Sequence, residues 1–257
     1  MALVNRTTSE TRRSKVDPGR SGDPGERPRA TGASRALPIA SLLLGALSFI
    51  GMIVSIWAIF LYAPTDAIEG QPQRIFYFHV PMAWVALLAS GVLAATSIVY
   101  LWKRDERWDY AARASAELGA VFTTFALITG SLWGRPTWGT WWTWDPKLTA
   151  TLVLWFIYVG YLLLRNYMGR TPASARAAAV LGIIGFIDVP IIYEAVNWWR
   201  GLHPAAVTTP GALPPQMVVT LVLSVITFTL LFSFLMLQLY SLEKMQTLAQ
   251  RLRASIE

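Results

Sequence analysis

The sequence predicts an all-α integral membrane protein, a bundle of six transmembrane helices with one tryptophan-rich loop. Of its 257 residues, 54% are hydrophobic and only 14% are charged, which is too apolar for an ordinary water-soluble domain. Apolar stretches long enough to cross a bilayer recur along the chain. Backbone groups inside lipid must pair within their own segment, so each stretch should be a helix. The third observation is a cluster of five tryptophans in one connection.

Residues 1–35 are rich in Arg, Ser, Gly and Pro, which predicts a disordered cytoplasmic tail. Six apolar runs follow, each close to or above the roughly 20 residues that a spanning helix needs: 36–65, 75–102, 114–133, 148–164, 177–196 and 214–240. The fifth is the least regular because Asp188, Pro190 and Glu194 interrupt it, and Pro190 favours an end of the helix near that point. The six-helix membrane domain therefore covers 36–242, and 243–257 form a cytoplasmic C-terminal tail.

Basic residues predict the orientation. The N-terminal tail, the second-to-third and fourth-to-fifth connections and the C-terminal tail hold all but four of the 22 lysines and arginines. By the positive-inside rule both termini are cytoplasmic. The four exceptions belong to the other side of the membrane: Arg74, Arg135, Lys147 and Arg200.

The chain contains no cysteine, which excludes disulfides, thiolate metal sites and covalent haem attachment through a CxxCH motif. Any metal ligand must come from His, Met or carboxylates. Only two histidines occur, His79 at the start of the second run and His203 between the fifth and sixth. Four crossings separate them, so both emerge on the non-cytoplasmic face. The tryptophan-rich connection, two crossings after His79, lies on that face too.

Two imidazoles and several indoles on one face are typical of a haem site. Two neutral imidazoles can coordinate haem iron from opposite sides, and indole rings can lie against the flat porphyrin. A short helix over 138–145 would place four of its side chains on one face: Trp138, Trp141, Trp142 and Asp145. The tryptophans of the cluster are Trp133, Trp138, Trp141, Trp142 and Trp144.

The haem propionates would require cations on the same side of the membrane. The sequence offers only four there: Arg74, Arg135, Lys147 and Arg200. Interfacial cations more usually extend to lipid headgroups, and that alternative stays open.

The other features also have plainer explanations. A histidine at a membrane interface is more often a hydrogen-bonding group than a ligand. Aromatic belts anchor many multi-span proteins, although a belt distributes its rings over many helix ends. Asp145 followed by Pro146 is typical of a helix N-cap. Asp188 and Glu194 are candidates for proton sites, for partners of Arg200 or for hydrated groups near the interface.

The run WGRPTWGTWWTWDPKLT resembles the tryptophan-rich WWD signature of the haem-handling membrane proteins used in cytochrome c maturation. Within that superfamily, RIFYFHVPMAW around His79 and VNWWRGLHP around His203 are similar to the haem exporter protein C branch (cytochrome c maturation protein C). The resemblance covers roughly residues 37–242. The long polar N-terminal tail and the charges of Asp188 and Glu194 depart from the pattern of the family.

The resemblance implies that His79 and His203 are axial ligands of a non-covalent, transiently bound haem b at the periplasmic face of a bacterial inner membrane. The tryptophan-rich loop would then be the platform for the haem. The implied partners are an ATP-binding-cassette pair (maturation proteins A and B), the small membrane protein D and a periplasmic haem chaperone (maturation protein E). Lipid surrounds the chain, and no nucleic acid is implied. The resemblance implies a carrier rather than an enzyme, since no nucleophile, general base or thiol is arranged for catalysis.

Three other functions stay open on the sequence alone. A b-type electron-transfer cytochrome would also use histidines, and two histidines allow one bis-histidine haem. A haem-attachment synthase of the same superfamily usually has a longer chain with more histidines. A transporter permease subunit would need no cofactor.

Overall fold

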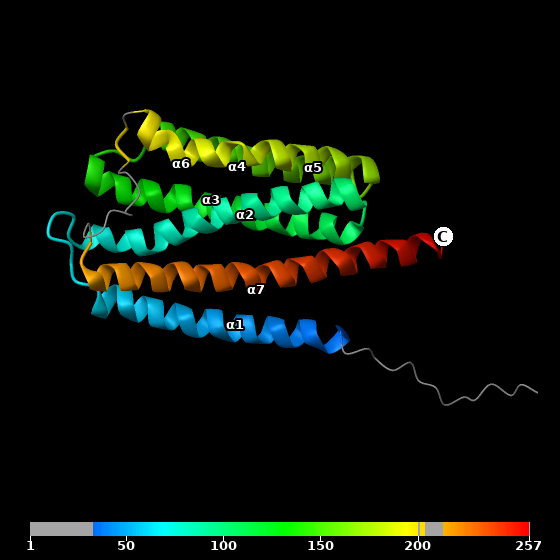
Figure 1. Ribbon diagram of the computed structural model, residues 1–257, viewed down its shortest axis with the longest axis horizontal. Helices are drawn as coiled ribbons and strands as arrows, with labels where there is room; N and C mark the ends of the chain where they lie inside the picture. Colours follow the sequence, from blue (N-terminus) through cyan, green and yellow to red (C-terminus); the bar gives the residue numbers. More distant parts are fainter. Residues whose placement is uncertain (1–32, 200, 204–212, 257) are drawn as a thin grey trace, which may run out of the picture.

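The computed structural model describes residues 33–199, 201–203 and 213–256, so residues 1–32 of the predicted tail and Arg200 lie outside the described residues. Apart from one β-bridge between Asp66 and Gly70, every regular element of the described chain is helical, as predicted (Figure 1). The elements are α1 (Ala33–Trp57), η1 (Ala58–Tyr62), η2 (Gln71–Ile75), α2 (Phe76–Lys103), α3 (Glu106–Trp138), α4 (Pro146–Tyr167), α5 (Pro172–Phe186), α6 (Asp188–Trp198) and α7 (Pro215–Ala254).

Six helical stretches of the described chain are long and apolar enough to cross a membrane, which confirms the predicted count. Helix α1 continues into η1 to form the first stretch, η2 and α2 together form the second, and α5 with α6 forms the fifth. The described chain begins and ends at the same end of the bundle (Figure 1).

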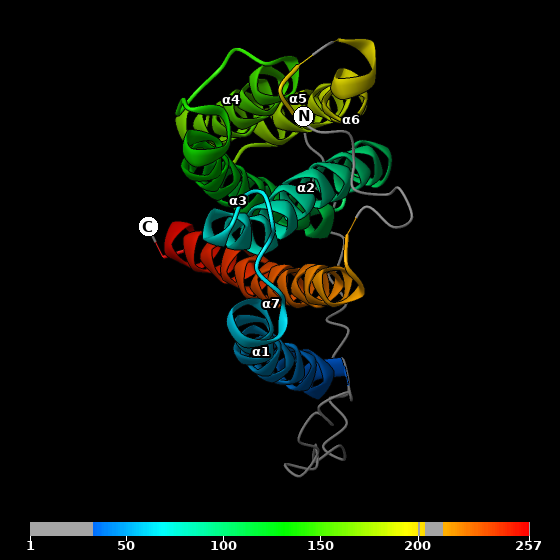
Figure 2. The ribbon, with the colours of Figure 1, turned by 90° about the vertical axis from the view of Figure 1, so that its left-hand side faces the viewer.

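The helices are arranged in layers, which the end-on view of Figure 2 shows clearly. Helix α1 is outermost and packs on α7, α7 packs on α2 and α3, and α4, α5 and α6 cover the opposite side of that pair. Large apolar side chains of α1 such as Leu42 and Phe49 point outward and are mostly exposed. Such a surface suits lipid, because a spanning helix keeps its apolar side chains toward the hydrocarbon.

Close packing in the centre depends on small residues, as is usual between helices in membranes. A Cβ atom on Gly119 of α3 would overlap the ring of Tyr158 of α4. Tyr158 is fully buried, and its hydroxyl donates to the carbonyl oxygen of Ala86 at 2.7 Å. Gly119 therefore lets one tyrosine join α4 to both α3 and α2.

The fifth span differs from its prediction. Pro190 does not mark the end of the helix, because α5 stops at Phe186 and α6 begins again at Asp188 and continues to Trp198. Pro190 lies in the first turn of α6, where its missing N–H would have had no helical partner. Asp188 is the acidic residue of that first turn, where the helix dipole favours a negative charge.

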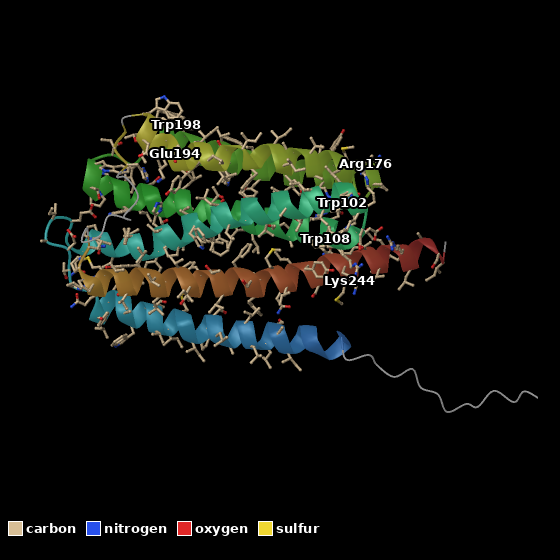
Figure 3. The ribbon with its side chains drawn as sticks, viewed as in Figure 1. Trp102, Trp108, Arg176, Glu194, Trp198 and Lys244 are labelled. Carbon is tan, nitrogen blue, oxygen red and sulfur yellow. The ribbon has the colours of Figure 1, made fainter. Side chains whose placement is uncertain are left out.

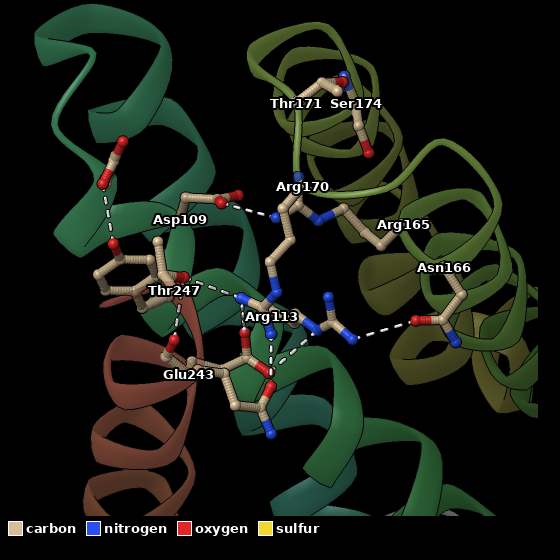
Figure 4. Close-up of polar contacts among 12 residues, drawn as sticks. Asp109, Arg113, Arg165, Asn166, Arg170, Thr171, Ser174, Glu243 and Thr247 are labelled. Carbon is tan, nitrogen blue, oxygen red and sulfur yellow. Dashed lines mark hydrogen bonds and ion pairs between the residues drawn. The ribbon is translucent and has the colours of Figure 1, made fainter. Parts of the chain in front are cut away.

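The two ends of the bundle carry different chemistry. Trp198 lies at the end where the tryptophan-rich loop is found, whereas Trp102, Trp108, Arg176 and Lys244 lie at the opposite end (Figure 3). Helix α7 continues beyond the predicted sixth run through most of the predicted C-terminal tail, to Ala254. This extension carries Glu243, which is buried. Its carboxylate forms ion pairs with Nε of Arg113 at 3.2 Å and with Nη1 of Arg170 at 2.7 Å (Figure 4).

Candidate functional site

His79 lies in the first turns of α2 and contacts α3 through its ring nitrogen. Its Nδ1 atom is 3.1 Å from the hydroxyl of Thr129. That hydroxyl donates its only proton to the carbonyl of Phe125 at 2.7 Å, so it accepts from a protonated Nδ1. A neutral imidazole protonated on Nδ1 keeps a lone pair on Nε2. The hydrogen bond thus leaves on Nε2 the lone pair that a metal ion would require.

Trp133 lies one turn after Thr129 on the same face of α3. The ring centroids of Trp133 and His79 are 5.9 Å apart, and the indole Nε1 donates to Glu69 at 2.8 Å. Between them, a Cβ atom on Gly130 would lie only 2.9 Å from Cε1 of His79. Gly130 therefore leaves the space that the imidazole occupies.

Helix α3 ends at Trp138 and α4 begins at Pro146, so the short helix considered over 138–145 does not form. The physical reason is Gly139, which takes a φ of 77° and ends the helix in the left-handed conformation that glycine adopts without strain. Arg135 caps this end by donating to the carbonyl of Gly139. The ring of Trp138 lies edge-on to His203, with centroids 5.2 Å apart.

Asp145 joins the tryptophan-rich loop to the segment that carries His203. Its Oδ1 atom accepts the backbone N–H of Lys147 at 3.0 Å, so the predicted N-cap of α4 is confirmed. Its Oδ2 atom accepts the N–H of Leu202 at 2.7 Å and that of His203 at 3.4 Å. A Cβ atom on Gly201 would overlap the Asp145 carboxylate. The carboxylate is buried, and the close approach requires glycine at position 201.

His203 is held as a neutral imidazole. Burial lowers the pKa of His203 to about 4; Lys147 acts in the same direction and Asp145 opposes it. The Nδ1 atom of His203 is buried, has no hydrogen-bond partner among the described residues and lies 3.9 Å from Asp145. Neutral imidazole is the form that binds metal ions.

The remaining predicted residues are distributed unevenly. Trp141 and Trp144 are 58% and 75% exposed, and Trp142 packs edge-on against Trp144 with centroids 5.7 Å apart. The guanidinium of Arg74 donates to Gln71 at 2.7 Å and to the carbonyl of Ile59. Arg135 is engaged at the end of α3, and among the described residues neither predicted arginine forms a hydrogen bond with His79 or His203.

A small cavity of about 180 Å³ lies beside these residues, and its walls are Glu69, Trp133, Gly134, Thr137, Trp138 and Leu202. Pockets that enclose a drug-sized ligand begin at about 300 Å³. A ligand as large as haem therefore cannot be enclosed there. Beside this cavity, the indoles of Trp141 and Trp144 form exposed apolar surface.

A model of the heme exporter protein C family matches residues 30–255. The chain belongs to the heme exporter protein C family. It is similar to the heme exporter protein C of Bradyrhizobium diazoefficiens, with 44% identity over 173 residues that make up 66% of each chain. It is also similar to that of Escherichia coli K12, with 40% identity over 71% of this chain and 74% of the relative. A putative cytochrome c biosynthesis ccmC-like mitochondrial protein of Arabidopsis thaliana is 33% identical over 87% of this chain and 84% of its own length.

Membership of the heme exporter protein C family confirms the predicted resemblance and places the chain in cytochrome c maturation. The sequence did not point to four residues of the site: Glu69, Thr129, Gly130 and Gly201. The spacing of Thr129 and Trp133, four residues apart, was the available signal, because it puts a hydroxyl and an indole on one helix face. The roles of the two glycines depend on His79 and Asp145, which lie far from them in the sequence.

Proposed function

We propose that this member of the heme exporter protein C family binds haem transiently through His79 and His203 and presents it to a haem chaperone. One observation supports the proposal most directly: both histidines pack against tryptophans in the last two turns of α3. His79 packs against Trp133, and His203 packs against Trp138. One helix end thus gathers two imidazoles that lie far apart in the sequence.

The two imidazoles suit iron ligation for separate reasons. His79 offers Nε2 because Thr129 occupies Nδ1, and His203 is neutral because burial lowers its pKa. Haem presents a flat apolar ring, and the exposed Trp141 and Trp144 offer apolar surface that could lie along it. The iron supplies the two axial positions that the imidazoles would fill.

An open site fits a carrier better than a storage protein. Because the neighbouring cavity is too small to enclose the porphyrin, one edge of the haem would stay accessible to an acceptor. We assign the chain a transfer role without catalysis of its own. Its partners in this proposal are the ATP-binding-cassette pair A and B, the small protein D and the periplasmic chaperone E.

The site would face the periplasm, with both termini in the cytoplasm, because the positive-inside rule assigns the basic connections to the cytoplasm. Among the described basic residues, Arg176 and Lys244 lie at the end opposite the tryptophan-rich loop (Figure 3). The absence of cysteine makes this testable by labelling. Ile68→Cys introduces a thiol at a 96% exposed position near the tryptophan-rich loop, and Lys244→Cys introduces one at the other end. In intact cells a membrane-impermeant maleimide should label Ile68→Cys only. Labelling of Lys244→Cys alone would contradict the orientation.

Delivery is tested by co-expressing the chain with its maturation partners and measuring haem on the chaperone. His79→Ala and His203→Ala should each strongly reduce haem-loaded chaperone at equal levels of membrane protein. Asp188→Asn, in the fifth span and away from both histidines, should leave delivery unchanged. Normal delivery by both histidine variants would refute the proposed function.

A further inference from the structure

A second cavity is lined by residues at the end of the bundle opposite the tryptophan-rich loop. At this end α2, α4 and α7 finish and α3 and α5 begin (Figure 1). The volume of the cavity is about 680 Å³, within the range of about 300–1,000 Å³ that ligand pockets occupy. Its charged walls are strongly basic. Five arginines and two carboxylates line it: Arg104, Arg165, Arg170, Arg176, Arg251, Glu106 and Asp109.

The carboxylates do not balance this charge. Asp109 accepts from Arg165 at 2.7 Å, and Glu106 accepts from Arg251. Arg170 is held by Glu243, outside the cavity wall, and by the hydroxyl of Thr247 at 3.1 Å (Figure 4).

Two further arginines in the lining add positive charge that these carboxylates do not neutralise. Arg104 and Arg176 are exposed, and within the described residues neither guanidinium group donates to a protein acceptor. Figure 3 shows Arg176 at this end of the bundle.

Arg165, in the wall of the cavity, has buried N–H donors that lack acceptors among the described residues. Its side chain is only 2% exposed, and one of its terminal nitrogens is paired with Asp109. Its Nε and Nη1 atoms have no acceptor among the described residues. A guanidinium has no way to shed its proton at ordinary pH, so buried donors of this kind are costly unless an acceptor reaches them. An anion in the cavity would supply that acceptor.

We propose that this cavity binds a phosphate group, supplied by the headgroup of an anionic phospholipid. A phosphate offers several oxygens to forked guanidinium donors, and arginine matches it with two parallel hydrogen bonds. The position favours a lipid source, because the cavity lies at the ends of spanning helices. Figure 3 shows Trp102 and Trp108 at the same end of the bundle. Basic pockets between spanning helices are a recognised form of headgroup site. This site is independent of the haem proposal.

The test uses the full chain in detergent, stripped of lipid, with thermal unfolding and native mass spectrometry as readouts. Dioleoyl phosphatidylglycerol should bind and raise the unfolding temperature, and dioleoyl phosphatidylcholine should do so much less. Arg104→Gln and Arg176→Gln should each weaken binding of phosphatidylglycerol roughly fivefold, and the double variant about 25-fold. Arg253→Gln removes an exposed arginine that does not line the cavity and is the matched control. It should bind as the wild type does.

Inorganic phosphate distinguishes the source of the group. Stabilisation by phosphatidylglycerol alone assigns the site to the lipid headgroup. Stabilisation by both, lost in the Arg104 and Arg176 variants, supports phosphate recognition from either source. Equal stabilisation by the two lipids would overturn the proposal. So would an equal loss of phosphatidylglycerol binding in Arg253→Gln and in the cavity variants; water would then be the acceptor for the buried donors of Arg165.

Discussion

The hydroxyl of Thr129 fixes the tautomer of His79, because it donates to the carbonyl of Phe125 and accepts a hydrogen bond from Nδ1, which lies 3.1 Å away. Thr129→Val keeps the shape of the side chain and removes the acceptor. We expect haem affinity to fall roughly tenfold or more, the usual scale for losing a partner that orients a metal-binding histidine. Titration of haem into the purified protein, followed by absorption, measures this.

Two companion variants separate orientation from packing. Thr129→Ser keeps the hydroxyl and should restore most of the affinity. Thr151→Val removes a hydroxyl that donates only within α4 and should bind haem normally. Equal affinities for Thr129→Val and the wild type would show that His79 does not depend on Thr129.

Asp145 has two functions that substitution can separate. Asparagine still accepts the N–H of Lys147, but its amide nitrogen cannot replace the second carboxylate oxygen that accepts from Leu202. Asp145→Asn should therefore retain the helix cap and lose haem affinity. Asp145→Ala should lose both, with about 1 kcal/mol of stability lost with the cap. If Asp145→Asn bound haem as tightly as the wild type, the link to the His203 segment would have no role in binding.

Gly130→Ala should displace the imidazole of His79 while the bundle stays folded. The added methyl group would meet the free end of the His79 ring, which can move, rather than the backbone. Gly160→Ala is the control, since nothing lies within 4 Å of its new Cβ atom. We expect lower haem affinity for Gly130→Ala alone, with similar unfolding temperatures for both. Unchanged haem binding in Gly130→Ala would contradict the placement of His79.

The haem-free protein should lose stability as the pH falls from about 6.5 to about 4. Burial lowers the pKa of His203 from its ordinary value of 6.5 to about 4, against the pull of Asp145. The unfolded chain takes up the proton first, so the contribution of His203 to folding is complete above pH 6.5 and is lost below it. Thermal unfolding across this range should show a smaller decline in His203→Ala than in the wild type. An identical decline in stability of His203→Ala and the wild type would show that a group other than His203 causes it.

Glu243→Gln should destabilise the bundle without altering the haem site. The carboxylate is 5% exposed and pairs with both Arg113 and Arg170, so its loss leaves two partly buried cations without their shared partner. The expected cost is about 3 kcal/mol. Glu106→Gln breaks an exposed pair with Arg251 and should cost less than about 1 kcal/mol. Equal effects of the two variants in thermal unfolding would refute this account of α7.

The spans were predictable because hydrophobic length is a property of the sequence alone. The runs between charged connections corresponded to helices, and the parity of crossings correctly placed the segments of His79 and His203 at one end of the described bundle. Asp145 was predicted as an N-cap because Pro146 follows it, and the hydrogen bond to Lys147 is present.

The details that depend on tertiary contact were not predictable. The spacing of Trp138, Trp141, Trp142 and Asp145 suits a helix, but Gly139 ends α3 before that spacing can matter. Pro190 indicates a helix end from the sequence, yet neighbouring helices support a fifth span that breaks at Ile187 and continues. The direction of Arg74, toward Gln71 and the carbonyl of Ile59, depends on a connection whose path the sequence does not specify.

The central claim is that His79 and His203 together bind one haem, and the absorption spectrum of the purified chain titrated with haem tests it most directly. The account predicts saturation at one haem per chain with a low-spin, six-coordinate spectrum. Each single alanine variant should shift the spectrum toward five-coordinate iron, and the double variant should bind little haem. Wild-type spectra in both single variants would contradict the claim.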